Sequence, residues 1–242
     1  MRAAWSYNGR ELESMAFAVN YHRWILDIFK PFLGKHLVEV GAGSGSFSEI
    51  IMETLPDSLS MIEPSANMFP ILADRIRAID ERRVGRVYQG TLSDALEAVR
   101  KPDLPDAIIY VNVLEHIKDD VRELATAHSA LGPGGRVLVF VPANRWLMSA
   151  LDHQMGHYRR YSLDELTLKC RSAGFKVLLA SYFDILGIIP WWVRYCLLRS
   201  TRMEPAAVRL YDRYIVPISR ILESAIRPPI GKNIILVGQK LT

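Results

Sequence analysis

The hydrophobic and polar positions of this chain follow two periods, one typical of buried strands and one typical of amphipathic helices. Short apolar runs bounded by glycine, proline or acidic residues predict seven strands, at 36–40, 59–62, 86–89, 106–111, 136–141, 175–182 and 233–239. Apolar residues three or four positions apart predict helices at 11–32, 46–54, 65–79, 93–100, 119–131 and 162–173. Ser65, Ser93 and Ser162 are the expected N-caps of three of them.

Strands that alternate with helices predict an α/β fold, in which a mostly parallel sheet is covered by helices on both faces. Ligands of such sheets bind beyond the carboxyl ends of the strands. The chemistry of this chain is therefore expected at 39–45, Glu63, 90–92, 112–116 and 142–144.

Three glycines follow the first predicted strand, at Gly41, Gly43 and Gly45. Because glycine has no Cβ, such a turn lets a nucleotide-like ligand lie against the backbone. The G-x-G-x-G spacing differs from the dinucleotide fingerprint G-x-G-x-x-G, which disfavours a NAD-dependent oxidoreductase. Glu63 ends the second predicted strand, where a carboxylate can accept hydrogen bonds from ribose hydroxyls.

The segment 39–45, E-V-G-A-G-S-G, resembles motif I of the class I methyltransferases that use S-adenosylmethionine. Segments 63–68 (E-P-S-A-N-M), 106–117 (D-A-I-I-Y-V-N-V-L-E-H-I) and 131–139 (L-G-P-G-G-R-V-L-V) resemble the same family in the same order. The resemblance covers roughly 35–182. It implies a doubly wound seven-stranded sheet of order 3-2-1-4-5-7-6, with the last strand antiparallel. It also implies one domain over 1–242, with N-terminal helices in 1–34 and an insertion at 183–232.

The resemblance implies that S-adenosylmethionine is the cofactor and S-adenosylhomocysteine the product. Glu39 and the backbone of 41–45 would hold the methionine part, and Glu63 would hold the ribose. The cofactor-binding residues that it implies are Glu39, Gly41, Ala42, Gly43, Gly45, Glu63, Pro64, Met68, Thr91, Leu92 and Asn112. Many relatives have an aspartate after the third strand, but here 90–94 reads G-T-L-S-D. The adenine contact is therefore left to Thr91, to backbone groups or to a displaced Asp94.

Three histidines are candidates for a catalytic base, since a hydroxyl acceptor must lose a proton and histidine titrates near neutral pH. His157 and His153 follow the fifth predicted strand, and His116 follows the fourth. The i, i+4 spacing of His153 and His157 also matches a metal-binding pair. Gly156 weakens a helix there and no third ligand follows from the sequence, so no metal is predicted.

The segment 156–162, G-H-Y-R-R-Y-S, resembles a subgroup of bacterial class I methyltransferases found with glycosyltransferases and enzymes of surface polysaccharide synthesis. Arg159 and Arg160 in this segment can receive a carboxylate or phosphate of the acceptor, or can only complete surface ion pairs. The expected acceptor is a small molecule, a sugar or a lipid-linked glycan precursor. The alternative is a SAM-binding regulatory or scaffold protein that transfers no methyl group.

The net charge of +4 is concentrated in one region. Between Ile185 and Lys232 there are eight basic and three acidic residues, a local net charge of +5 against −1 for the rest. This distribution makes nucleic acid an unlikely partner and indicates a local basic surface.

The same basic region carries an apolar run, 185–193, and an expected helix at 206–226 that Pro217 should kink. Val208, Tyr211, Ile215, Ile218 and Leu222 fall on one side of that helix and its arginines on another. A basic amphipathic helix beside a tryptophan-bearing apolar run predicts contact with a membrane surface. A lid over the acceptor or a homodimer contact is the alternative.

Two cysteines, at Cys170 and Cys196, form no ligand-like or disulfide framework. The N-terminal residues show no apolar signal region, and no uncharged apolar run reaches the roughly 20 residues that span a bilayer. These patterns predict a cytoplasmic protein, peripheral to the inner face of the membrane if the basic region contacts lipid.

Overall fold

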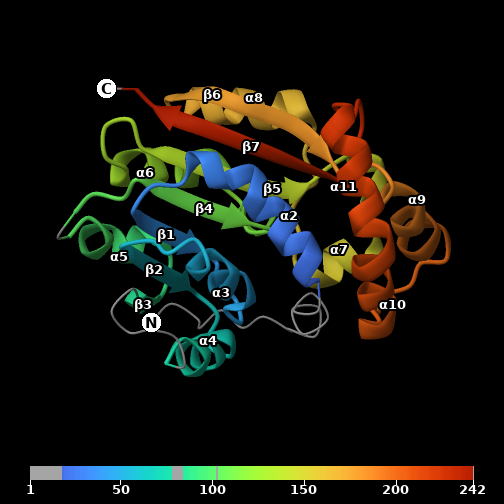
Figure 1. The fold of residues 1–242 in the computed structure, drawn as a ribbon, viewed down its shortest axis with the longest axis horizontal. Coiled ribbons are helices and arrows are strands. Elements are labelled where there is room, and N and C mark those ends of the chain that lie inside the picture. The colour runs from blue at the N-terminus through green and yellow to red at the C-terminus, as the bar shows by residue number, and fades with distance from the viewer. Residues whose placement is uncertain (1–17, 78–83, 102, 242) are drawn as a thin grey trace.

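A seven-stranded sheet with helices on both faces organises the chain (Figure 1). The computed structural model describes residues 18–77, 84–101 and 103–241. The strands are β1 (His36–Val40), β2 (Ser58–Glu63), β3 (Val84–Gln89), β4 (Ala107–Val111), β5 (Arg136–Pro142), β6 (Phe175–Phe183) and β7 (Asn233–Lys240). They lie in the order β3-β2-β1-β4-β5-β7-β6, and β7 is antiparallel to both of its neighbours. The predicted fold class and strand order are therefore confirmed.

The helices begin and end close to the predicted positions. Before the insertion they are α2 (Val19–Phe29), α3 (Ser46–Met52), α4 (Met68–Ile76), α5 (Leu92–Val99), α6 (Asp120–Ala130), α7 (Ala150–Met155) and α8 (Leu163–Ser172). The expected N-terminal helices overlap α2 from residue 19 on, whereas 11–17 lie outside the described residues. The short helix α7 was not predicted.

One of the three expected serine caps is confirmed. The Ser162 hydroxyl accepts the N–H of Glu165 at the start of α8. Helix α4 begins only at Met68, and Asn67 rather than Ser65 is its N-cap. Helix α5 is capped by Thr91, which forms a reciprocal capping box with Asp94, so Ser93 lies inside the first turn.

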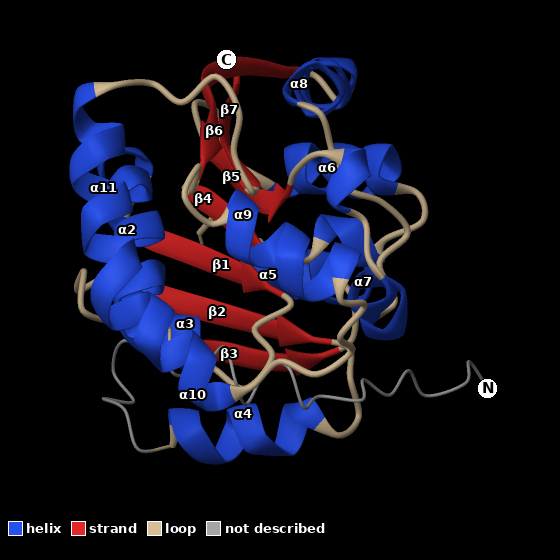
Figure 2. Ribbon diagram, turned by 90° about the vertical axis from the view of Figure 1, so that its right-hand side faces the viewer, coloured by secondary structure: helices blue, strands red, loops and turns tan. Residues whose placement is uncertain are grey.

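The two faces of the sheet bury separate apolar clusters because side chains alternate along each strand. On β1, Leu37 packs with α2 and α3, while Val38 and Val40 pack on the opposite face with α5, α6 and α8. Figure 2 shows these two helical layers on either side of the strands. Because β1 to β5 are parallel, the loops that follow them lie at one edge of the sheet.

The insertion between β6 and β7 is helical and lies beyond the carboxyl ends of the parallel strands (Figure 1). It contains α9 (Ile188–Trp191), a π-helical segment (Trp192–Leu197), α10 (Pro205–Leu210), a second π-helical segment (Tyr211–Ile215) and α11 (Val216–Ala225). Among the described residues, no helix combines the length and apolar character needed to cross a membrane.

The expected helix at 206–226 is interrupted rather than continuous. A π-helical turn stands directly before Pro217, which lacks the N–H that an α-helix needs at that point. The wider turn changes the phase of the side chains. Val208 and Tyr211 pack against the core, whereas Ile218 and Leu222 are exposed, so the single apolar side predicted from the sequence is divided.

Candidate functional site

A cleft of about 570 Å³ opens at the carboxyl edge of the sheet, a size typical of small-molecule sites. It extends from the glycine turn after β1, past the ends of β2, β4 and β5, to the helical insertion. One half is lined by the expected cofactor residues and the other by histidines and the insertion. The cofactor half lies against Glu39, Gly41, Ala42, Gly43, Glu63, Pro64, Met68, Thr91, Leu92 and Asn112.

The glycine turn needs its glycines for two different reasons. Gly41 and Gly43 have φ angles of 71° and 56° and line the cleft. A Cβ on Gly41 would lie 2.5 Å from Val113 Cγ2, so a side chain there does not fit. Gly45, with φ of 81°, is the N-cap of α3 and does not line the cleft. Its Cβ would lie 2.9 Å from Leu72 Cδ1, which indicates a packing role.

Two buried carboxylates, those of Glu39 and Glu63, line this half of the cleft. Glu63 accepts the backbone N–H of Gly43 at Oε2 and that of Ser65 at Oε1, each at 2.7 Å. Burial raises the pKa of Glu63, although these two hydrogen bonds oppose the shift. A carboxylate has about four lone-pair sites, so two remain for the hydroxyls of a ribose. The site therefore fits the nucleoside part of the expected cofactor.

Glu39 lies deeper in the same half and accepts a hydrogen bond from the Ser48 hydroxyl. Burial raises the pKa of Glu39 to about 8, and the nearby charge of Glu63 adds to the effect. Such a carboxyl gains a favourable partner when a cation arrives beside it. The ammonium and sulfonium of S-adenosylmethionine are cations of that kind.

Asp94, one of the candidates for the adenine contact, is engaged in the cap of a helix. Its carboxylate accepts the N–H and the hydroxyl of Thr91, at 3.0 and 2.7 Å, within the capping box of α5. Thr91 and Leu92 line the cleft, and Asp94 does not. At the opposite wall Asn112 has a φ of 54°, which turns the chain sharply where β4 ends.

The structure separates the three candidate histidines. His116 and His157 both line the cleft, and their ring centroids lie 4.6 Å apart. Burial lowers the pKa of His116 to about 3, so its imidazole is neutral. His153 is exposed on α7 and does not line the cleft. The separation arises because α7 ends at Gly156, whose φ of 83° reverses the chain and brings His157 inward.

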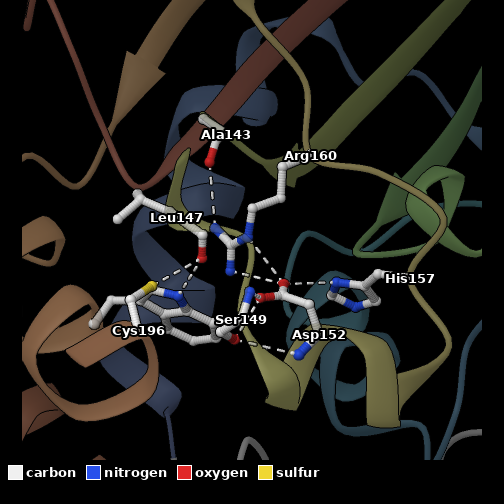
Figure 3. Close-up of polar contacts among 8 residues, drawn as sticks. Ala143, Leu147, Ser149, Asp152, His157, Arg160 and Cys196 are labelled. Atoms are coloured by element: carbon white, nitrogen blue, oxygen red, sulfur yellow. Dashed lines mark hydrogen bonds and ion pairs between the residues drawn. The ribbon is translucent and has the colours of Figure 1, made fainter. Parts of the chain in front are cut away.

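A buried cluster around Asp152 holds His157 in place (Figure 3). Asp152 Oδ1 lies 2.9 Å from His157 Nδ1 and 2.8 Å from Arg160 Nη2. Burial by itself would raise the pKa of Asp152, but the hydrogen bond with His157 and the charge of Arg160 lower it to about 2. Ser149 and Asp152 also form the capping box that begins α7.

Both arginines of the G-H-Y-R-R-Y-S segment are engaged in ion pairs. Arg160 is buried against Asp152 and also donates to the backbone oxygen of Ala143. Arg159 Nη1 lies 2.6 Å from the Asp120 carboxylate. The expectation that they receive an anionic acceptor is not supported, because protein carboxylates already occupy them. The alternative, surface ion pairs, is confirmed in part: both arginines pair with carboxylates, but the pair of Arg160 with Asp152 is buried.

Glu115 is a cleft residue that the sequence analysis did not single out. It is fully buried beside His116 and His157, and burial raises its pKa to about 7. Its signal in the sequence was the acid–histidine pair Glu115-His116 within 112–116, the segment that follows the fourth predicted strand.

The helical insertion closes the second half of the cleft. Trp191 and Met203 line it, together with Lys232 and Asn233 at the start of β7. The Trp191 indole donates to the backbone oxygen of Leu147 at 3.1 Å, and the Arg160 guanidinium stacks 4.5 Å from its ring. The insertion is thereby fixed to the cluster that holds His157.

Comparisons with known proteins agree with this arrangement. A family profile described as a methyltransferase domain matches residues 12–180. Phosphoethanolamine N-methyltransferase 2 of Caenorhabditis elegans is 26% identical over 111 residues, which cover 46% of this chain and 24% of that protein. The ubiquinone biosynthesis O-methyltransferase of Aeromonas salmonicida is 28% identical over 116 residues, covering 48% and 47%. The matches thus span less than half of these relatives.

Solved structures share the fold over nearly the whole chain. A SAM-dependent methyltransferase from Archaeoglobus fulgidus is 14% identical with a TM-score of 0.57, and the match covers 96% of this chain and 94% of that one. Phosphoethanolamine N-methyltransferase 2 of Haemonchus contortus in complex with S-adenosyl-L-methionine is 17% identical with a TM-score of 0.60, covering 94% and 57%.

Proposed function

This chain belongs to the methyltransferase-domain family, and we propose that it transfers the methyl group of S-adenosylmethionine to a hydroxyl of a lipid-linked glycan precursor. The first half of the cleft supports the cofactor. The bare backbone at Gly41 and Gly43 adjoins Glu63, which keeps two acceptor sites for a ribose, and Glu39, which gains from a neighbouring cation.

The second half of the cleft supports an acceptor that must lose a proton. Methyl transfer is an in-line displacement at sulfur, for which a protein supplies alignment and exclusion of water. His157 is oriented by Asp152, and Glu115 has a pKa of about 7. Both groups line the cleft, which supports a role as catalytic base or proton relay for an acceptor hydroxyl.

A lipid-linked acceptor is supported by two features of the insertion, which lines the cleft and also exposes apolar side chains. The segment that lines the cleft through Trp191 and Met203 also exposes apolar side chains, and Ile189 and Leu198 are each 70% exposed. Others in the segment are Trp192, Leu197, Leu210 and Ile221. A large exposed apolar surface next to a site indicates contact with a membrane or a partner.

Positive charge favours the membrane as the occupant of this surface. The exposed arginines of the segment are Arg199, Arg202, Arg209, Arg213, Arg220 and Arg227. Exposed apolar side chains mixed with arginine match a surface that inserts between anionic headgroups. An acceptor with a lipid anchor would then reach the cleft at the edge that faces the bilayer.

Methyl-labelled S-adenosylmethionine tests the proposal directly. The protein and the labelled cofactor are incubated with membranes and with soluble extract separately, and Glu63→Ala serves as the inactive control. We expect label in organic-extractable membrane material. Label only in soluble material would make the insertion a lid, and no label despite cofactor binding would favour a protein that binds the cofactor without transferring its methyl group. Sedimentation of the purified protein shows whether a second copy covers the apolar surface instead.

A further inference from the structure

We propose that Glu115, His116 and His157 bind a divalent transition-metal ion in the second half of the cleft, which is lined by histidines and the insertion and is called the acceptor half below. Each residue offers one ligand atom, and the three atoms lie within 4.8 Å of one another. Ligand atoms around a tetrahedral zinc ion lie about 3.4 Å apart, so the three side chains would rotate toward one another when the ion binds. All three residues line the same cleft as the cofactor residues.

Glu115 is the observation that calls for a cation. Its side chain is fully buried, and no other residue that the structure describes donates a hydrogen bond to either carboxylate oxygen. Buried polar groups are nearly always paired, and a buried carboxylate without a partner is costly. A metal ion at the cluster would supply that partner and would also use the two imidazoles beside it.

His157 is prepared for coordination by its contact with Asp152. The 2.9 Å contact between His157 Nδ1 and Asp152 Oδ1 places the proton on Nδ1, which leaves the lone pair on Nε2. Carboxylate–histidine pairs of this kind orient metal-binding imidazoles and strengthen them as ligands. The Arg160 guanidinium in turn fixes Asp152 from the opposite side.

The ligand set indicates the class of metal. Two imidazoles and one carboxylate suit zinc, iron or manganese, whereas calcium and magnesium prefer oxygen ligands. Three protein ligands leave at least one position open, as in catalytic metal sites. The pair that the sequence offered, His153 with His157, is not the site. The further ligands come from the end of β4, which only the fold brings next to His157.

An open position on the ion would receive the oxygen of the acceptor, and this step rests on the proposed methyl transfer. Coordination lowers the pKa of a hydroxyl, so its proton passes to bulk water. The oxygen–methyl bond then forms as the sulfur–methyl bond breaks, and S-adenosylhomocysteine leaves. With the ion bound, Glu115 and His157 would act as its ligands. The ion, rather than either side chain, would then activate the acceptor hydroxyl.

Binding of Co²⁺ to the tag-free protein tests the site independently of catalysis. Chelator-treated wild type is titrated by calorimetry and by the visible absorption of Co²⁺. We expect one saturable site. Glu115→Gln and His157→Gln should each weaken binding by at least about tenfold, a loss that even outer-shell changes can cause. His153→Gln is the matched control, since His153 is an exposed histidine four residues from His157, and it should bind like the wild type.

Separate results bear on the site and on its role. Absence of saturable binding, or wild-type affinity in Glu115→Gln protein whose circular dichroism is native, would overturn the site. Full methyl transfer by chelator-treated wild type would overturn the role of the ion in activating the acceptor. Methyl transfer that fails both with and without metal would count against the proposed function, while the calorimetric result would still decide the site.

Discussion

Asp152 and Arg160 form a buried ion pair in which Oδ1 and Nη2 lie 2.8 Å apart. The same carboxylate oxygen also accepts Arg160 Nε–H and contacts His157 Nδ1 (Figure 3). Asp152 therefore has three roles. It belongs to the capping box of α7, neutralises the buried Arg160 and orients the His157 imidazole in the cleft. The stability of this region and the geometry of the site depend on the same side chain.

Replacing Asp152 by asparagine should destabilise the protein by roughly 3–5 kcal/mol, because a buried Arg160 would lose its counter-charge. Urea unfolding at pH 7 measures the change. Asp164→Asn, at an exposed position in the first turn of α8, should remain within about 0.5 kcal/mol of wild type. Equal effects of the two substitutions would contradict the importance of the buried pair.

Replacing Glu63 by alanine should raise the dissociation constant for S-adenosylmethionine by at least about 100-fold. The reason is the loss of charge-assisted hydrogen bonds, each worth about 1.5–3 kcal/mol. Calorimetric titration of the cofactor gives the value directly. Glu97→Gln, an exposed acid on α5, should bind with wild-type affinity. A Glu63→Ala protein that binds as tightly as wild type would remove Glu63 from the cofactor site.

Cofactor binding at pH 7 should release protons from Glu39. Burial raises its pKa to about 8, so the free protein holds it protonated, and the cationic cofactor should lower that pKa. Titrations in buffers of different ionisation enthalpy count the protons released. Glu39→Gln should abolish the release and Glu49→Gln, at an exposed position on α3, should not. A wild type that takes up protons instead would show that the cation lies elsewhere.

His22 should make the protein less stable in acid. Burial lowers its pKa to about 4, below the ordinary value of 6.5 that applies in the unfolded chain. The unfolded state therefore binds more protons between pH 6.5 and 4, and the free energy of unfolding should fall by about 3 kcal/mol as the pH drops through this window. Above pH 6.5 the effect vanishes.

The control for this pH dependence is a second histidine. His22→Gln should show a shallower decline of unfolding free energy between pH 6.5 and 4, whereas His153→Gln should keep the wild-type slope, since His153 is exposed. Urea unfolding at several pH values gives both curves. Identical slopes in wild type and His22→Gln would show that folding does not lower the pKa of His22.

The exposed apolar side chains of the insertion should be needed for membrane binding. In sedimentation with vesicles of phosphatidylcholine and phosphatidylglycerol, the double substitution of Ile189 and Leu198 by serine should weaken binding by at least about tenfold, since each buried side chain contributes about 1.5–3 kcal/mol. Leu168→Ser, at an equally exposed apolar position on α8, should bind like wild type. Binding should also weaken as salt rises. Insensitivity to the double substitution would leave the insertion as a lid.

The sequence alone predicted the seven strands and the main helices that cover them, but not α7 or the interruption of the insertion helix. The cofactor residues expected from the sequence, except Gly45, line one half of the cleft. The strand at His36–Val40 was placed to the residue, because apolar alternation and the following glycines are local properties. The position of Glu63 followed from the same logic, since the carboxyl ends of parallel strands share one edge. The caps were predicted less well than the strands. Thr91 rather than Ser93 is the N-cap of α5, and Thr91 and Asp94 form a reciprocal capping box.

Only the tertiary structure decided the acceptor half. Arg159 and Arg160 looked available for an anion, but the fold brings Asp120 and Asp152 against them. His157 meets Glu115 because Gly156 reverses the chain toward the end of β4. The hydrophobic period along a helix or strand indicates which residues are buried, because it depends only on residues a few positions apart in the sequence. The partner of a buried charge is chosen by distant segments that meet in the folded chain, and no local pattern records it.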